Sequence, residues 1–259
     1  MTAVNLDLTG KTALVCGASA GIGKATAMTF AAHGANVVAL ARRRERLEEL
    51  VPQLEAAGAG SARFIVADLD DLQGLSQAVD GLDAQILINN TGGPPAGPLI
   101  AANPQALASA FARHVLAAQT LVQALLPGMQ GAGYGRIINV LSTSVREPIP
   151  NLGVSNTIRG AMASWSKSLS KELAPGITIN NVLPGFTDTE RLTSLKTAVA
   201  NRTGQNEDAV HAGWLGRVPE GRLGRPEELA ATIAFLVSPA GAYIRGQSLA
   251  VDGGRLNTI

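Results

Sequence analysis

Glycines are concentrated in one short segment near the start of the chain. Residues 17–23 read Gly-Ala-Ser-Ala-Gly-Ile-Gly; they follow the apolar run at residues 12–16 and lead into an apolar helical pattern at residues 22–33. Glycines let the backbone turn tightly and approach a pyrophosphate, and a helix N-terminus offers it free N–H groups and the positive end of the helix dipole. Because strand, turn and helix follow one another in this order, the segment predicts a dinucleotide-binding turn rather than a plain connection.

Arginines occupy the place where a ribose-binding carboxylate is expected. The second predicted strand, residues 36–41, is followed by Arg42, Arg43 and Arg44, with no acidic residue at its tip. NAD sites usually hold the ribose 2′-OH with an acidic residue at this point. Guanidinium groups instead suit a 2′-phosphate, because they offer charge and forked donors. The sequence therefore predicts NADP(H), with Arg42 as the leading contact and Arg43 as the second, whereas Arg44 fits a solvated helix start.

The elements that must position these groups alternate between strands and helices. The predicted strands are residues 12–16, 36–41, 63–66, 86–89, 136–141, 178–183 and 248–251, and the predicted helices are residues 22–33, 44–57, 72–79, 104–126, 155–173 and 226–236. Such alternation indicates βαβ units and a parallel sheet covered on both faces. With right-handed crossovers, the simplest α/β architecture is one Rossmann-type, doubly wound parallel sheet of about seven strands in a single domain, residues 1–259.

One segment, residues 190–221, interrupts the alternation. It is polar, follows the carboxyl end of a predicted strand and has a helical pattern. A long insertion at this place is where a substrate lid would lie, and we expect one here. The alternative is a pair of surface helices with no such role.

Composition excludes several classes of protein. The chain has 259 residues and a formal net charge of +1, which argues against a nucleic-acid partner. The single cysteine, Cys16, permits no disulfide, and the three histidines are too widely spaced for a metal site, so we expect no metal. The N-terminus lacks a signal-peptide pattern and no apolar run reaches about 18 residues, so we expect a cytoplasmic protein without a membrane partner.

An ordered series of motifs extends along nearly the whole chain. Its members are residues 8–11 (LTGK), the glycine-rich segment, Asp68-Leu69, residues 89–92 (NNTG), Pro184-Gly185 with Thr189, residues 221–228 (GRLGRPEE) and residues 251–254 (VDGG). The series resembles the short-chain dehydrogenase/reductase family, and is most similar to its 3-oxoacyl-carrier-protein reductase-like members. The resemblance implies a Rossmann domain, a nicotinamide cofactor, a small-molecule substrate and a homo-oligomer, a tetramer or dimer, that pairs helices 104–126 and 155–173.

The glycine-rich segment, the arginines and the resemblance together define a cofactor-binding set. It comprises Gly17, Ser19, Ala20, Gly21, Ile22, Gly23, Arg42, Arg43, Asp68, Leu69, Asn90, Thr91, Gly92, Arg159, Pro184, Gly185, Thr187 and Thr189.

The chain departs from the family where the chemistry should be. The family uses a tetrad of Asn, Ser, Tyr and Lys. Aligning the chain with the family pattern places His114 at the Asn position and Ser142 at the Ser position. Ser155 and Arg159 then stand where the family has its Tyr-x-x-x-Lys pair. The resemblance therefore implies a catalytic set of Ser142, Ser155, Arg159 and His114 with an atypical proton donor.

These residue types limit the chemistry of the site. A serine hydroxyl is a much weaker acid than a phenol, whose pKa is about 10, and its shorter reach calls for an ordered water as a relay. Arg159 stays charged and can bind ribose hydroxyls, an oxyanion or a substrate carboxylate. Ser155 and Arg159 are one helical turn apart, so both should face the site, where Ser142 would contact the carbonyl oxygen.

His114 is expected to be the only nearby group that titrates near neutral pH. One hypothesis is that it supplies the proton through water and Ser155. The alternative is a packed histidine with a satisfied hydrogen bond.

Residues 146–148 (Arg-Glu-Pro) and the lid are expected to line the pocket.

Two functions remain open at this point. The first is an NADP(H)-dependent oxidoreductase that interconverts a small ketone or aldehyde and an alcohol by hydride transfer. The alternative is a non-redox NADP(H)-binding protein on the same fold, acting as a sensor or scaffold or using lyase or hydrolase chemistry. The missing Tyr-Lys pair favours the alternative, and Ser142 with the rest of the substrate side favours the oxidoreductase.

Overall fold

A seven-stranded parallel sheet forms the centre of the molecule. The computed structural model describes residues 4–258, and the sheet order is β3-β2-β1-β4-β5-β6-β7. The strands are β1 (Thr12–Cys16), β2 (Asn36–Ala41), β3 (Ser61–Val66), β4 (Ile86–Asn89), β5 (Gly135–Val140), β6 (Ile177–Pro184) and β7 (Ser248–Val251). The strand order confirms the doubly wound parallel sheet that the alternating pattern predicted.

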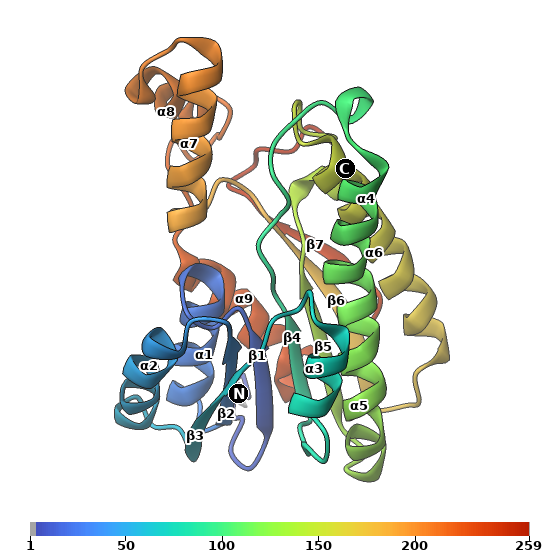
Figure 1. Ribbon diagram of the computed structural model, residues 1–259. Helices are drawn as coiled ribbons and strands as arrows, with labels where there is room; N and C mark the ends of the chain where they lie inside the picture. The colour runs from blue at the N-terminus through green and yellow to red at the C-terminus, as the bar shows by residue number, and fades with distance from the viewer. Residues whose placement is uncertain (1–3, 259) are drawn as a thin grey trace.

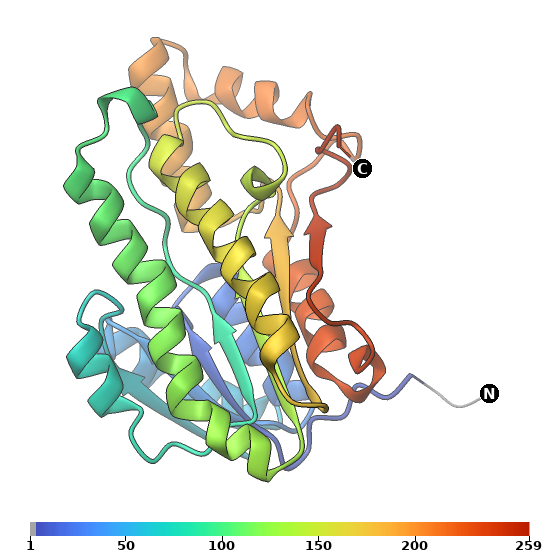
Figure 2. The same ribbon diagram turned by 90° about the vertical axis from the view of Figure 1, so that its right-hand side faces the viewer.

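Helices cover both faces because neighbouring strand residues point to opposite sides. In β1, Val15 packs with α1 (Gly21–Ala32), α2 (Arg44–Ala56) and α9 (Pro226–Val237). Leu14 points the other way, toward α3 (Leu72–Ala78) and α5 (Ala117–Gly131). Helix α4 (Pro104–Phe111) runs in line with α5, and α6 (Gly153–Glu172) lies alongside them on this second face (Figures 1 and 2). The core is therefore two apolar layers, one on each side of the sheet.

The direction of winding reverses between β1 and β4. Leu14 of β1 pairs with Val38 of β2 on one side and with Leu87 of β4 on the other. In open parallel sheets, ligands bind in the crevice that such a reversal opens at the carboxyl ends of the strands. The glycine-rich segment follows β1 and Asn90 follows β4, so both lie at this crevice.

The expectation of one uninterrupted helix at residues 104–126 was wrong. A π-helical segment, η2 (Ala112–Leu116), separates α4 from α5, and α5 continues past Pro127 to Gly131. The continuation is stabilised because Met129, beyond the proline, is fully buried in the core. The wider π-helical turn carries His114, which is only 3% exposed.

The segment after β6 forms two helices, α7 (Glu190–Thr203) and α8 (Glu207–Leu215). Thr189 and Asn206 cap them, accepting hydrogen bonds from Leu192 N–H and Ala209 N–H. The two helices extend beyond the carboxyl ends of the strands, above the sheet in Figure 1. The stacked rings of Phe186 and Trp214, 5.1 Å apart between centroids, join α8 to the chain that leaves β6. Within residues 4–258, no helix has the length and apolar content needed to cross a membrane.

Candidate active site

A cavity of about 710 Å³ opens at the carboxyl ends of the strands and extends to α7. Its volume is within the range of small-molecule and cofactor sites. The predicted residues that line it are Gly17, Ser19, Ala20, Gly21, Ile22, Arg42, Arg43, Asp68, Leu69, Asn90, Thr91, Gly92, Ser142, Ser155, Arg159, Pro184, Gly185, Thr187 and Thr189. Two of the predicted site residues, Gly23 and His114, do not line this cavity.

The glycine-rich segment requires glycine for close packing. Gly17 and Gly21 have φ angles of +64° and +53°, in the left-handed region that favours glycine. A Cβ on Gly23 would overlap the carbonyl oxygen of Gly17 and come within 2.7 Å of Asn90 Nδ2. Asn90 in turn donates to the carbonyl oxygen of Cys16 at 3.3 Å. Gly23 therefore lets α1 pack against the turn and does not itself face the cavity.

The N-terminus of α1 fits a pyrophosphate group. Its N-cap, Ala20, has no side chain that could satisfy the first N–H groups, and no acidic side chain lies in the first turn. These N–H groups and the positive end of the helix dipole face the cavity that Gly21 and Ile22 line. The structure thus supplies the backbone donors that a dinucleotide needs.

The arginines after β2 lie at the same end of the cavity. Arg43 donates from Nη2 to Ser19 Oγ at 3.0 Å and lies 3.7 Å from a carboxylate oxygen of Glu190. Arg42 lies 3.6 Å from a carboxylate oxygen of Asp68. Both side chains are well exposed, so these ion pairs are weak and can rearrange around a ligand. Two cations and the Ser19 hydroxyl at this place fit a 2′-phosphate.

Ser142 follows β5 and caps the short 3₁₀ helix η3 (Thr143–Val145). Its Oγ accepts a hydrogen bond from the Ser144 N–H at 3.1 Å. Because this bond uses an oxygen lone pair, the hydroxyl proton is left to donate to a ligand. Ser155 and Arg159 line the same cavity from adjacent turns of α6, as the spacing of four residues predicted.

Arg159 is a buried cation, only 7% exposed. It donates from Nη1 to the Val140 carbonyl at 3.0 Å and from Nη2 to the Thr91 carbonyl at 3.2 Å. Burial, and then the nearby Arg191 charge, lowers the pKa of its guanidinium to about 10, so the group remains protonated at neutral pH. The two carbonyls hold the guanidinium between the ends of β4 and β5.

The expectation that His114 titrates near neutral pH was wrong. Burial, and then the charges of Arg159 and Arg113, lowers the pKa of its imidazole to about 3. Its Nε2 is buried without a hydrogen-bond partner among residues 4–258. The side chain lines a separate cavity of about 20 Å³, which Arg159 also lines. His114 is therefore an uncharged residue behind Arg159 at physiological pH.

The tyrosine and cysteine side chains lie away from the cavity. Tyr134 donates to the Val237 carbonyl and Tyr243 is fully exposed, and neither lines the cavity. Cys16 is fully buried in the core, and burial raises the pKa of its thiol to about 12. No tyrosine hydroxyl among residues 4–258 thus replaces Ser155 at the site.

The prediction that residues 146–148 line the pocket was wrong, and other residues that line it were missed. Arg146 instead donates to the Ser248 carbonyl at 2.8 Å, on the edge strand β7. Arg191, at the start of α7, and Arg255, near the C-terminus, line the cavity together with Gly93. The position of Arg191, two residues after Thr189 in the Pro-Gly motif, was the signal that could have identified it.

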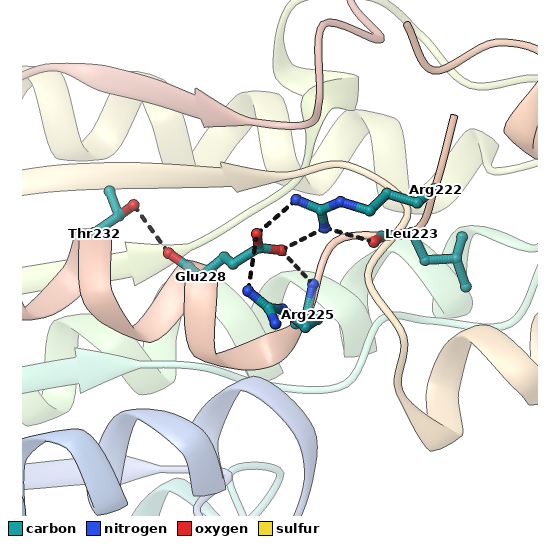
Figure 3. A network of polar contacts seen from close by, with 5 residues as sticks. All are labelled: Arg222, Leu223, Arg225, Glu228 and Thr232. Carbon is teal, nitrogen blue, oxygen red and sulfur yellow. Dashed lines mark hydrogen bonds and ion pairs between the residues drawn. The ribbon is translucent and has the colours of Figure 1, made fainter. Parts of the chain in front are cut away.

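The GRLGRPEE motif anchors the chain that carries Thr187. Glu228 accepts from Arg222 through both carboxylate oxygens, at 2.8 and 2.7 Å, and from the Arg225 N–H at 2.8 Å (Figure 3). These bonds lower the pKa of the Glu228 carboxyl to about 2. Gly224, inside the loop that they hold, forms a parallel bridge with Thr187. The motif therefore fixes the strand end that leads into α7.

Comparisons with known proteins agree with this geometry. Residues 17–255 match the profile of the family described as enoyl-(acyl carrier protein) reductase. The chain is 34% identical over 256 residues to the 3-oxoacyl-(acyl-carrier-protein) reductase FabG of Vibrio cholerae, covering 96% of this chain and 98% of that protein. It is 32% identical over 255 residues to a 2,3-dihydroxy-2,3-dihydro-p-cumate dehydrogenase of Pseudomonas putida, covering 96% and 95% of the two chains.

Solved structures show the same fold. The L-sorbose reductase of Gluconobacter frateurii, solved with NADPH and L-sorbose, matches with a TM-score of 0.91 at 29% identity, over 98% of this chain and 100% of that one. A 3-oxoacyl-(acyl-carrier-protein) reductase of Agrobacterium tumefaciens with bound NADP matches with a TM-score of 0.86 at 25% identity, over 96% and 95% of the chains. Given these matches along its length, the chain belongs to the short-chain dehydrogenase/reductase family.

Proposed function

We propose that the protein is an NADP(H)-dependent oxidoreductase that interconverts a small ketone or aldehyde and the corresponding alcohol. The observation that carries the proposal is a single cavity lined at one end by the glycine-rich segment with Arg42 and Arg43, and also by Ser142, Ser155 and Arg159. NADPH, when bound, would supply the hydride. The family membership and the NADPH or NADP named for the solved relatives support this cofactor.

Each side chain of the site has a role that its environment supports. The Ser142 hydroxyl donates to the carbonyl oxygen of the substrate, because the bond that it accepts from Ser144 N–H leaves its proton free. Arg159 stabilises negative charge on that oxygen or binds ribose hydroxyls from its fixed position. Ser155, in place of the family's tyrosine, relays a proton from water. Leu192 and Leu195 of α7 line the cavity, which supports a lid role for residues 190–221.

The loss of NADPH absorbance with a panel of small ketones and aldehydes tests this proposal. We expect turnover with at least one carbonyl compound, and a decrease of about 10-fold or more in kcat/KM for Ser142→Ala, because the carbonyl loses its donor. A matched control is Ser168→Ala, since Ser168 lies on the same helix as Ser155 but donates only to the Ser164 carbonyl. Turnover that Ser142→Ala leaves unchanged would contradict the assigned role.

The second candidate is a non-redox NADP(H)-binding protein. Ser155 and Arg159 favour it, since neither side chain offers an acid with a pKa near neutrality. The double variant Ser155→Tyr/Arg159→Lys separates the two candidates. If the variant reduces carbonyl compounds that the unmodified protein leaves untouched, the protein has lost reductase chemistry and the oxidoreductase proposal fails.

The proposal includes a homo-oligomer and a cytoplasmic location. Phe111, directly before the π-helical segment, and Leu116, its last residue, are 40% and 41% exposed. Their position on the α4–α5 face is consistent with a helix-pairing interface. Light scattering after size-exclusion chromatography should give a mass of two or four chains, and Phe111→Glu should reduce it.

A further inference from the structure

Two guanidinium groups and a hydroxyl converge beside Gly93, in the loop that follows β4. A point at the position of a Cβ on Gly93 lies 3.7 Å from Arg191 Nη2, 3.8 Å from Ser155 Oγ and 3.9 Å from Arg159 Nη2. The three groups come from α6 and α7, which are distant in sequence from Gly93. All four residues line the main cavity, so the polar atoms surround a volume that a ligand can enter.

The positive charge of this cluster is unmatched. Arg159 is 93% buried, and its hydrogen bonds go to the carbonyls of Val140 and Thr91. Arg191 donates to the Pro94 carbonyl at 3.0 Å. Among residues 4–258, no carboxylate oxygen lies within 4.0 Å of either guanidinium. Arg159 is buried and Arg191 is exposed, and two like charges this close together are unfavourable, above all for the buried one, unless an anion joins them.

We propose that Arg159 and Arg191 bind the carboxylate of an anionic substrate beside Ser155, so that the enzyme acts on a short oxo- or hydroxycarboxylic acid. Planar guanidinium groups match a carboxylate through paired hydrogen bonds, and the Ser155 hydroxyl keeps its one proton for the relay. This inference rests on the proposed oxidoreductase function, because it names the substrate class for the same site.

The charge belongs to the substrate rather than to the cofactor because phosphate has its own ligands elsewhere. The free N–H groups of α1, at the glycine-rich segment, provide one anion site, and Arg42, Arg43 and Ser19 provide a second. The cluster beside Gly93 includes Ser155 of the proposed proton relay, and Arg159 is held to Val140 at the end of β5, the strand that Ser142 follows closely. An anion bound there is at the reacting end of the cavity.

The loop itself offers a variant that fills the site without disturbing the fold. In Gly93→Ala, the new methyl group would make ordinary contacts of 3.7 to 3.9 Å with the three groups, and Gly93 has no positive φ that would strain an alanine. Gly97→Ala is the matched control, because a Cβ there meets no atom within 4 Å and Gly97 does not line the cavity. Arg191→Gln removes one guanidinium from an exposed side chain and tests the charge directly.

The experiment is a calorimetric titration of the free protein and of the NADP⁺-saturated protein with 2-oxopropanoate, 3-oxobutanoate and 4-oxopentanoate and with their methyl esters. We expect at least one acid to bind the NADP⁺-saturated protein and its ester to bind about 10-fold or more weakly, since the ester lacks the charge. Gly93→Ala and Arg191→Gln should each weaken binding of the acid by about 10-fold or more. Gly97→Ala should change the affinity for the acid by no more than about 2-fold. Circular dichroism confirms that each variant is folded.

Three outcomes would overturn the inference. The first is that no acid binds, and the second is that an acid and its ester bind equally. The third is that acids bind only the free protein, while the variants weaken NADP⁺ binding by the same factor as acid binding. That third result would assign the cluster to the cofactor. Because the readout is binding, its result is independent of turnover. Carboxylate binding without NADPH oxidation would uphold the anion site and refute the oxidoreductase function.

Discussion

Arginines lie at both ends of the cavity, but the two ends treat their charge differently. At the glycine-rich end, Arg42 and Arg43 are exposed and each is near a carboxylate, that of Asp68 or Glu190. In the Gly93 cluster, Arg159 is buried and Arg191 is held by a backbone carbonyl, with no carboxylate of residues 4–258 within 4.0 Å of either. Paired, exposed arginines can exchange partners at little energetic cost, whereas the buried, unpaired Arg159 beside a second cation remains unfavourable until an anion arrives.

This difference indicates how the two ends select their ligands. The glycine-rich end needs little preorganised charge, because α1 already presents backbone donors to a phosphate. The cluster end holds its cations with neutral carbonyls, which orient the guanidinium groups without cancelling their charge. The substrate is therefore expected to be recognised by charge that is fixed in place, and the cofactor by backbone donors together with arginines that rearrange around its 2′-phosphate.

The largest effect is expected at the glycine-rich end, where packing is closest. Gly23→Ala should lower the free energy of unfolding by about 3 kcal/mol or more and abolish NADPH binding, because the new methyl group overlaps the Gly17 carbonyl. Urea unfolding measures the change. Gly213→Ala in α8, where a Cβ meets nothing within 4 Å, is the control, and should stabilise the helix by about 0.5–1 kcal/mol. A Gly23→Ala protein as stable as the unmodified one would show that the turn is loosely packed.

Removing both exposed arginines should weaken the binding of NADPH by up to about 100-fold and leave the binding of NADH unchanged, because only NADPH carries the 2′-phosphate. The test is a pair of calorimetric titrations of the variant Arg42→Ala/Arg43→Ala. The single variants Arg42→Ala and Arg43→Ala show which of the two side chains contributes more to NADPH affinity. Equal losses for the two nucleotides would instead place these side chains on the part of the cofactor that both share.

The pH dependence of stability tests the environment behind Arg159. The folded-state pKa of His114, about 3, is below its ordinary value of 6.5, so the unfolded chain binds the proton more readily. The free energy of unfolding is therefore unaffected by His114 well above pH 6.5 and decreases as the pH falls toward 3. At pH 5 the decrease is about 2 kcal/mol. Unfolding measured from pH 8 to 5 should show this decrease in the unmodified protein and a smaller one in His114→Asn. Parallel curves would mean that His114 titrates normally.

The smallest effect is expected for Arg146, which sequence reasoning placed in the pocket. Its Nη2 donates to the Ser248 carbonyl from an exposed position, so Arg146→Ala should cost only about 0.5–1.5 kcal/mol of stability. Affinity for NADPH and for the oxo acids should stay within about 2-fold, the effect of a surface change away from the ligands. A larger loss of affinity would extend the charged cluster to β7.

Sequence patterns predicted most of the fold because its signals are local. The alternation of strands and helices gave the sheet, and the glycine-rich segment gave the crevice where β1 and β4 separate. The π-helical segment at residues 112–116 was missed, because nothing in the local sequence distinguishes it from an α-helical turn. The low pKa of His114 and the convergence of Arg159 with Arg191 depend on burial and on contacts between distant segments, and a single sequence encodes neither in a local pattern.

The measurement that tests the account most directly is a calorimetric titration of the unmodified protein with NADPH and, in parallel, with NADH. The charge-assisted contacts of Arg42 and Arg43 predict about 10- to 100-fold tighter binding of NADPH. That result would establish a working cofactor site at the glycine-rich end and direct the search for substrates to oxo acids. Equal affinities would contradict the assignment of the two arginines, and no binding of either nucleotide would contradict the oxidoreductase function itself.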